Sequence, residues 1–294
     1  SVRLYSSIRY DRARLDRGEF SWSHPDPYTF ASIQKLGGIC VDQAHFAAQA
    51  CKARGIPALF FTGEGVRGGH AWVGIMLSND KWDMDCGRYA YDNYATGSAS
   101  DPQTRKPITD HELELLAKRF RDTPEYLTSV FHLRFASILR AAGDPKRERT
   151  AIQSAISICP ANPDAWAAQT AWLKKNGGTP AELKTHFENA LRQFNTVREL
   201  RARYARLLAD TLTELGDTEG AKRILASEIT RNRSDRTDLS AIAAGEQVMS
   251  LIEAAKYNEV LPVFRRVVGK FGTSAPNDIF REVVKPAITK LHGA

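Results

Sequence analysis

The chain has 294 residues, of which 43% are hydrophobic and 26% are charged, and its formal net charge is +7. This length fits one large domain or two ordinary ones, and the composition is that of a soluble globular protein. No stretch approaches the ~20 apolar residues that a membrane span needs, and the N-terminal stretch lacks the apolar core of a signal peptide. The chain starts at Ser1 without an initiator Met. Both its compartment and its relation to a longer protein are therefore left open.

The positive charge is concentrated in the second half of the chain. Residues 1–130 contain 16 Lys and Arg against 16 Asp and Glu, whereas residues 131–294 contain 25 against 18. This asymmetry favours two modules. We attribute the excess to a solvated helical surface rather than to an acidic partner. No nucleic-acid-binding motif accompanies it, so we expect no nucleic-acid partner.

The first half reads as a mixture of helices and strands. It begins with an Arg-rich amphipathic helical entry over residues 1–24, which ends at the turn SHPDPY. The elements predicted after it are a helix over 41–53, a strand over 58–62, a flexible loop over 63–69, strands over 70–77 and 81–86 that join at a turn near 78–80, and a long surface loop over 91–107.

The second half has an almost wholly helical pattern. Thr109 with Glu112 forms a capping box that opens a helix at about Asp110, and Thr123-Pro124 opens another.

The glycines at 143, 177 and 216 mark successive turns between these helices, and the segments ILRAAGD and LTELGD end in the same way. These features resemble tetratricopeptide-type helical hairpins, whose period is about 34 residues, with a plain helical bundle as the alternative. We therefore expect an α+β domain over residues 1–130 and an all-α helical-repeat domain over residues 131–294.

Four cysteines, at 40, 51, 86 and 159, are too few and too irregular for a disulfide framework, and no CxxC motif suggests zinc. We expect no cofactor and no metal. A metal site formed by Cys40, His70 and either Asp85 or Cys86 is the weakest of the alternatives.

Cys40 stands where a reactive thiol would be expected. Two glycines precede it and the predicted helix begins directly after it, in GGICVDQAHFAAQACKARGIPA. The thiolate is the reactive form of cysteine, and the N–H groups at a helix start lower a thiol pKa. By contrast, Cys51 lies in mid-helix among alanines and is read as an inert core residue.

His70 and Asp85 follow on the next two predicted strands. Strand alternation places His70, Trp72 and Gly74 on one face, at the end of a glycine-rich loop. Asp85 would orient the imidazole, and Asp83 is its competitor on the same strand face. The three side chains at 40, 70 and 85 would then form a nucleophile, a general base and its orienting group.

An oxyanion formed on the attacked carbonyl needs hydrogen-bond donors. The backbone N–H of Cys40 is one candidate. The second is Gln34, six residues before the thiol, a spacing at which papain-like proteases place a glutamine. Tyr28 and a surface role for Gln34 are the alternatives.

Taken together, GGIC, the alanine-rich helix, GIPA, GGHAW and KWDMD resemble the transglutaminase-like superfamily between Tyr28 and Arg88, and more loosely over residues 1–130. The resemblance implies a papain-related fold with a Cys-His-Asp triad formed by Cys40, His70 and Asp85. One departure bears on the acid: the family often has Trp-x-x-x-Asp followed by Pro, whereas Asp85 is one residue nearer its tryptophan. The choice between the two aspartates therefore stays open.

Active members of this superfamily attack an amide carbonyl with a thiolate and pass through a thioester. We therefore expect a cysteine protease or amidase that acts on a protein or peptide, with the helical domain docking a partner or substrate. Hydrolysis is preferred because water is the default acceptor. The alternatives are a transglutaminase that cross-links protein glutamines, and a non-enzymatic scaffold with a vestigial triad.

Overall fold

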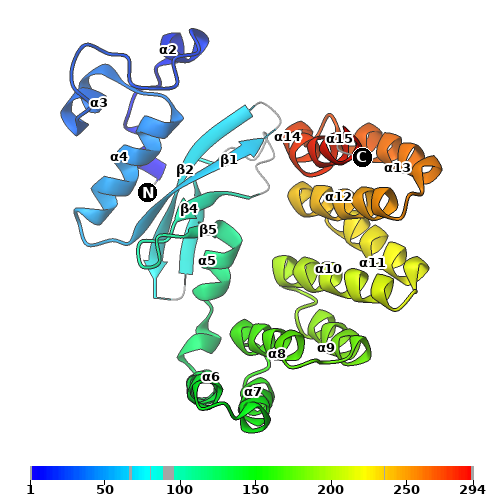
Figure 1. Cartoon of the computed structure of the whole chain (residues 1–294). Coiled ribbons are helices and arrows are strands. Elements are labelled where there is room, and N and C mark those ends of the chain that lie inside the picture. Colours follow the sequence, from blue (N-terminus) through cyan, green and yellow to red (C-terminus); the bar gives the residue numbers. More distant parts are fainter. Residues whose placement is uncertain (1, 66–67, 80, 89–95, 235, 293–294) are drawn as a thin grey trace. The chain divides into compact units, whose positions relative to one another are not determined.

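The computed structural model describes the chain except residues 1, 66–67, 80, 89–95, 235 and 293–294. The chain divides into two compact units, residues 1–118 and residues 119–294, which we call the sheet unit and the helical unit (Figure 1). None of the helices in the described residues is long and apolar enough to cross a membrane.

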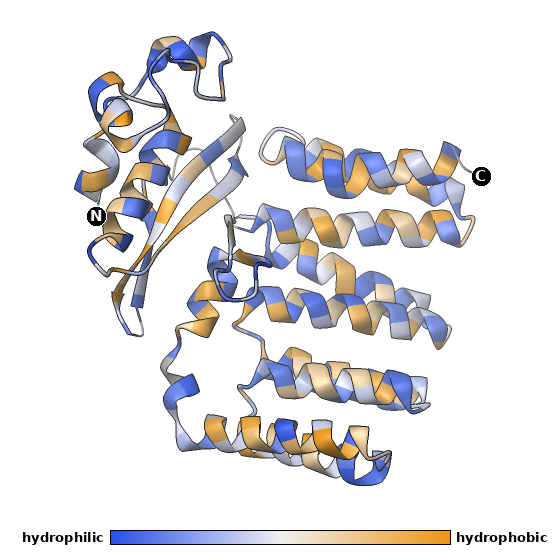
Figure 2. Ribbon diagram, turned by 60° about the vertical axis from the view of Figure 1, so that its left-hand side comes forward, coloured by the Kyte–Doolittle hydropathy of each residue, from blue (hydrophilic) through white to orange (hydrophobic). Residues whose placement is uncertain are grey.

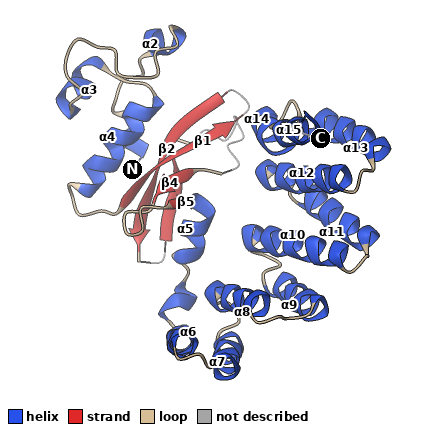
Figure 3. Ribbon diagram, viewed as in Figure 1, coloured by secondary structure: helices blue, strands red, loops and turns tan. Residues whose placement is uncertain are grey.

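The sheet unit contains a five-stranded antiparallel sheet with the strand order β3-β2-β1-β4-β5 (Figure 3). The strands are β1 (Ala58–Gly65), β2 (Gly68–Ser78), β3 (Lys81–Cys86), β4 (Ser98–Ser100) and β5 (Pro107–Thr109). The predicted loop over 63–69 was wrong where it is described, because β1 and β2 extend into it and Gly63 pairs with His70. The predicted surface loop over 91–107 was also wrong in part. It contains β4 and the start of β5, and residues 91–95 lie outside the described residues.

In the described part of this unit the sheet is accompanied by the helices α1 (Val2–Ser6), α2 (Arg12–Asp16), α3 (Phe30–Leu36), α4 (Cys40–Lys52) and α5 (Asp110–Leu116). The predicted helical entry over 1–24 is instead two short helices, the second of which is capped by the side chain of Asp11. Helix α3 was not predicted. The capping box of Thr109 and Glu112 is confirmed at the start of α5.

Alternation along β2 separates two small cores. Ala71, Val73 and Ile75 pack with the alanine face of α4. Trp72 on the other face packs with residues from β1, β4 and β5 and with Leu113 of α5. Small side chains on α4 let this helix lie close to the sheet, which fixes the position of its first residue, Cys40.

The helical unit consists of helices that pack mainly against their neighbours in sequence (Figure 1). They are α6 (Pro124–Ala141), α7 (Pro145–Ile158), α8 (Pro163–Lys175), α9 (Pro180–Gln193), α10 (Arg198–Glu214), α11 (Thr218–Arg231), α12 (Thr237–Glu253), α13 (Tyr257–Phe271), α14 (Pro276–Ile279) and α15 (Lys285–His292), with a 3-10 turn η2 (Arg119–Asp122) before α6 and a π-helical turn η3 (Phe280–Val284) before α15.

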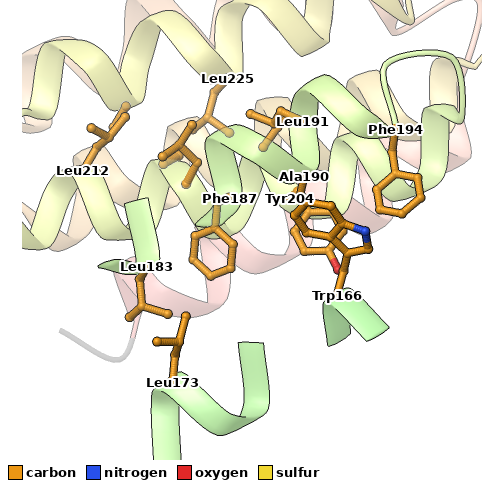
Figure 4. Packing of buried hydrophobic residues seen from close by; sticks show 14 residues of the cluster. Trp166, Leu173, Leu183, Phe187, Ala190, Leu191, Phe194, Tyr204, Leu212 and Leu225 are labelled. Atoms are coloured by element: carbon orange, nitrogen blue, oxygen red, sulfur yellow. The ribbon is translucent and has the colours of Figure 1, made fainter. Parts of the chain in front are cut away.

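The turns of this unit follow from its sequence. Gly143, Gly177 and Gly216 each have a positive φ between 71° and 82°, a backbone conformation that glycine adopts without steric cost. Hydrophobic residues appear as bands along the helices (Figure 2). Trp166, Phe187 and Tyr204 come from three different helices and meet in the largest core (Figure 4). The tetratricopeptide-like character of this arrangement stays a prediction.

Candidate active site

Cys40 is the first residue of α4, as the sequence predicted to within one residue. The helix is preceded by Ile39, whose N–H donates to Asp42 Oδ2 in the first turn at 2.9 Å. That hydrogen bond satisfies a donor just outside the helix, where backbone groups lack helical partners. Cys40 is therefore held by the cap of its own helix.

The two glycines before the thiol are required by close contacts. Gly37 has φ 89°, and a Cβ added there would lie 2.5 Å from the carbonyl oxygen of Arg9. A Cβ on Gly38 would lie 2.4 Å from Cβ of Asp42. Larger residues at either position would force the N-terminal segment or the α4 cap to move.

A buried ion pair fastens the N-terminal segment to α4 beside the thiol. Arg14 Nη1 lies 2.8 Å from Asp42 Oδ2, and the two side chains are 0% and 3% exposed. The contact has ion-pair distance without the alignment of a hydrogen bond. Arg14 also donates from Nε to the carbonyl of Glu19 and lies over the Trp22 ring. No local pattern predicts this pair, because its partners are 28 residues apart in the sequence.

The thiol of Cys40 is buried, with 8% of the residue exposed. Burial raises the pKa of the Cys40 thiol, and this outweighs the effect of the nearby backbone N–H groups of Ala71 and Val41, which act in the opposite direction. The expectation that the helix start gives a lowered pKa was therefore wrong, because desolvation exceeds the effect of these donors. Ala71, the residue that follows His70, belongs to the same buried cluster as Cys40.

His70 is 7% exposed and lies near the start of β2. Its ring stacks on Trp72, with the ring centroids 6.1 Å apart, as expected for residues on the same strand face. Nε2 lies 2.7 Å from the carbonyl oxygen of Gly87. Because a carbonyl oxygen only accepts, Nε2 carries the proton in this contact.

Gly87 is placed for this contact by its own backbone. Its φ is 85°, and an added Cβ would lie 2.4 Å from the ring of Tyr5. The Tyr5 hydroxyl in turn donates to the carbonyl of Ala71 at 2.9 Å. A chain of contacts thus joins Gly87 and Tyr5 to Ala71, the residue that follows His70.

The side chain of Asp85 lies beside Arg88, and no contact with the imidazole of His70 is described for it. Its side chain is 77% exposed, and Oδ1 lies 3.6 Å from Arg88 Nη1. In the β2–β3 ladder Val73 pairs with Cys86, with a register irregularity before Ile75 and Asp83. Asp85 therefore lies near the level of Val73, three residues beyond His70 along β2.

The competitor and the oxyanion candidate lie on other parts of the sheet unit. Asp83 pairs with Ile75 in the ladder, further from His70 than Asp85, and its Oδ1 accepts the N–H of Asp85 at 3.0 Å. Gln34 is exposed on α3. The structure thus brings Cys40 and the backbone of His70 together, and it brings neither Asp83 nor Gln34 to them.

Arg88 is a residue of this region that sequence reasoning missed. Its Nη1 lies 2.7 Å from Asp110 Oδ2, and Asp110 is buried at the first position of α5. The guanidinium also lies over the Trp72 ring, 4.9 Å from its centroid. Arg88 therefore connects the end of β3 to α5 and to the ring on which His70 stacks. In the sequence, only the position of Arg88 just after the predicted strand over 81–86 places it near the site.

The described residues contain no group of three or more His, Cys, Asp or Glu side chains arranged to hold a metal ion. All four cysteines are free thiols and buried.

Comparison with known proteins gives one finding. Residues 2–84 match the family model described as the transglutaminase-like superfamily, a span that contains Cys40 and His70 and ends one residue before Asp85. No curated protein and no solved structure matches the chain. The N-terminal part of the chain is therefore similar to the transglutaminase-like superfamily, whose active members use a catalytic cysteine.

Proposed function

We propose that the sheet unit is a cysteine-dependent amide acyl-transfer enzyme, a protease or amidase, with Cys40 as the nucleophile. The observation that carries the proposal is the position of the Cys40 sulfur. It lies at the start of α4, in the same buried cluster as Ala71, and the backbone N–H groups of Val41 and Ala71 lower the thiol pKa against the larger effect of burial. The match of residues 2–84 to a superfamily of cysteine enzymes supports it.

Burial has a consequence for the mechanism. Because burial favours the protonated thiol, attack on the carbonyl needs a base that takes the proton from the sulfur. We propose His70 as this base; in the neutral ring Nδ1 has the lone pair when Nε2–H donates to Gly87. In the first step the C–S bond forms, the amide C–N bond breaks, and the proton passes from His70 to the leaving amine. Water then hydrolyses the thioester.

The group that orients His70 is the third part of the proposal. We place the carbonyl of Gly87 in this role at rest, because it lies 2.7 Å from Nε2. Asp85 remains the proposed acid of the triad. At rest the carboxylate of Asp85 lies 3.6 Å from Arg88. To orient His70, Asp85 would have to leave Arg88 and contact the imidazole when substrate binds. A charged carboxylate would stabilise the imidazolium more than a carbonyl does.

The helical unit has a surface suited to docking a protein partner or substrate. A cavity of about 460 Å³ opens between α7, α8 and α9, a volume within the usual range of ligand pockets. Its walls combine apolar side chains with amides and hydroxyls.

The chain offers a matched pair of variants for testing the proposal. Cys40→Ala removes the proposed nucleophile, whereas Cys51→Ala removes another buried thiol of α4 that is 2% exposed. Each full-length protein is incubated with a peptide mixture and hydroxylamine, which converts a thioester into a stable hydroxamate. Mass spectrometry should find hydroxamates with the parent and Cys51→Ala proteins, and none with Cys40→Ala. Equal yields from Cys40→Ala would refute the assignment.

A second candidate function is a non-enzymatic scaffold with a vestigial triad. Two observations favour it: burial raises the pKa of the Cys40 thiol, and the side chain of Asp85 is largely exposed beside Arg88. The scaffold predicts no hydroxamate from any variant, although Cys40 would still alkylate slowly at high pH. The same experiment therefore separates the two functions.

A further inference from the structure

Two polar groups in the wall of the α7–α9 cavity lack hydrogen-bond partners among the described residues. Gln169 of α8 is 6% exposed and its Oε1 accepts no hydrogen bond. Arg149 of α7 has a buried Nε without an acceptor. Both residues line the cavity. A buried polar atom without a partner costs the folded state free energy, so each invites a ligand atom.

Arg149 is held in place by its other contacts. Its Nη2 donates to Glu182 Oε1 at 2.9 Å, and its guanidinium lies over the ring of Trp172, 4.8 Å from the centroid. These contacts hold the planar group, and its buried Nε has no acceptor among the described residues. Glu182 also neutralises the charge of Arg149, so the pair adds no net charge to the cavity and can contribute only an oriented hydrogen-bond donor.

Gln169 supplies the complementary acceptor. The terminal torsion of a glutamine has a broad energy minimum, so its carboxamide can turn toward the cavity at little cost. Trp166, Ile156 and Leu173 provide an apolar wall beside it.

The remaining titratable group of the cavity is neutral at physiological pH. Burial lowers the pKa of His186 to about 4, and its ring stacks on Trp166 with the centroids 5.4 Å apart. Nε2 contacts the hydroxyl of Thr170 at 3.0 Å and the carbonyl of Trp166 at 3.2 Å. With the imidazole uncharged and Arg149 paired to Glu182, the cavity carries no net charge.

We propose that this cavity binds the uncharged side-chain amide of a glutamine. The amide C=O would accept from Arg149 Nε and the amide N–H would donate to Gln169 Oε1. An amide carries one acceptor and one donor side by side, which a carboxylate or an ammonium group does not. The apolar wall would cover the adjoining methylene groups. This inference does not rest on the proposed catalytic function, because it concerns the helical unit alone.

The decisive variant is Gln169→Leu, which has nearly the same volume and no polar group. If Gln169 is retained for a ligand, its replacement should raise the melting temperature, because an unsatisfied buried acceptor is removed. It should also weaken ligand binding at least tenfold. A residue with only a structural role would not improve stability and lose binding together.

The probes are three capped peptides of equal length, in which glycine alternates with glutamine, glutamate or lysine. Calorimetric titration into the full-length parent should show binding of the glutamine peptide, and binding of the two charged peptides at least tenfold weaker. Gln153→Leu, at another cavity position, is the control for a general change of the surface. It should leave binding within about threefold of the parent.

Three results would overturn the proposal. They are preference for a charged peptide, equal binding by Gln169→Leu and the parent, and no detectable binding of the glutamine peptide at millimolar concentration. None of them bears on hydroxamate formation, so failure here is distinguishable from failure of the catalytic proposal.

Discussion

The Arg14–Asp42 pair offers a quantitative test of how the site is held. Asp42→Asn keeps an oxygen that can accept the N–H of Ile39, but it leaves the guanidinium of Arg14 buried without a counter-charge. Because the two side chains are 0% and 3% exposed, little solvent screens them. Breaking a buried pair by removing one partner costs about 3–5 kcal/mol, so we expect a loss of that size in the sheet unit.

The double variant Arg14→Met with Asp42→Asn separates charge from packing. With both charges gone, no ion remains buried, so we expect it to be more stable than Asp42→Asn by about 1–3 kcal/mol. The two units need not unfold together, so native-state hydrogen exchange resolved to peptides of α4 and β2 is the suitable measurement. A loss below about 1 kcal/mol in Asp42→Asn, or no recovery in the double variant, would refute the reasoning.

Three further predictions follow from the same geometry. Alkylation of Cys40 by iodoacetamide should be slow at pH 7 and still rising above pH 9.0, because burial raises the thiol pKa; a rate that levels off below pH 8 would contradict this. The helical unit should lose about 3 kcal/mol as the pH falls from 6.5 to about 4, because unfolded His186 takes up a proton that the folded imidazole excludes. Thermal melts of His186→Gln should show a smaller dependence over that window. Gly87→Ala should displace the carbonyl from His70 and the ring of Tyr5, lowering both stability and hydroxamate yield, whereas Gly143→Ala, in an open turn, should lower stability alone.

Local signals in the sequence predicted the frame of the sheet unit well. The glycine pair before Cys40, the small residues of α4 and the alternation around Trp72 each act over a few residues, and each holds in the structure. The short strands β4 and β5 were missed because they are only three residues long and lie in a polar stretch.

The less predictable features depend on tertiary contacts. The burial that sets the Cys40 pKa arises from packing between α4, α1 and the sheet, which no local pattern shows. The position of Asp85 depends on a register irregularity in β3, and Arg88 meets Asp110 across 22 residues of sequence. The sequence predicts an amphipathic helix for the N-terminal segment, whereas Arg14 of this segment is buried beside the site.

The central claim is that the sulfur of Cys40 becomes acylated with help from His70. The most direct measurement is intact-protein and peptide mass spectrometry after rapid mixing with an N-acetylated peptide p-nitroanilide. The account predicts an acyl adduct on Cys40 in the parent that accumulates at least tenfold more slowly in His70→Gln. An adduct on another cysteine, or an equal rate in His70→Gln, would contradict it.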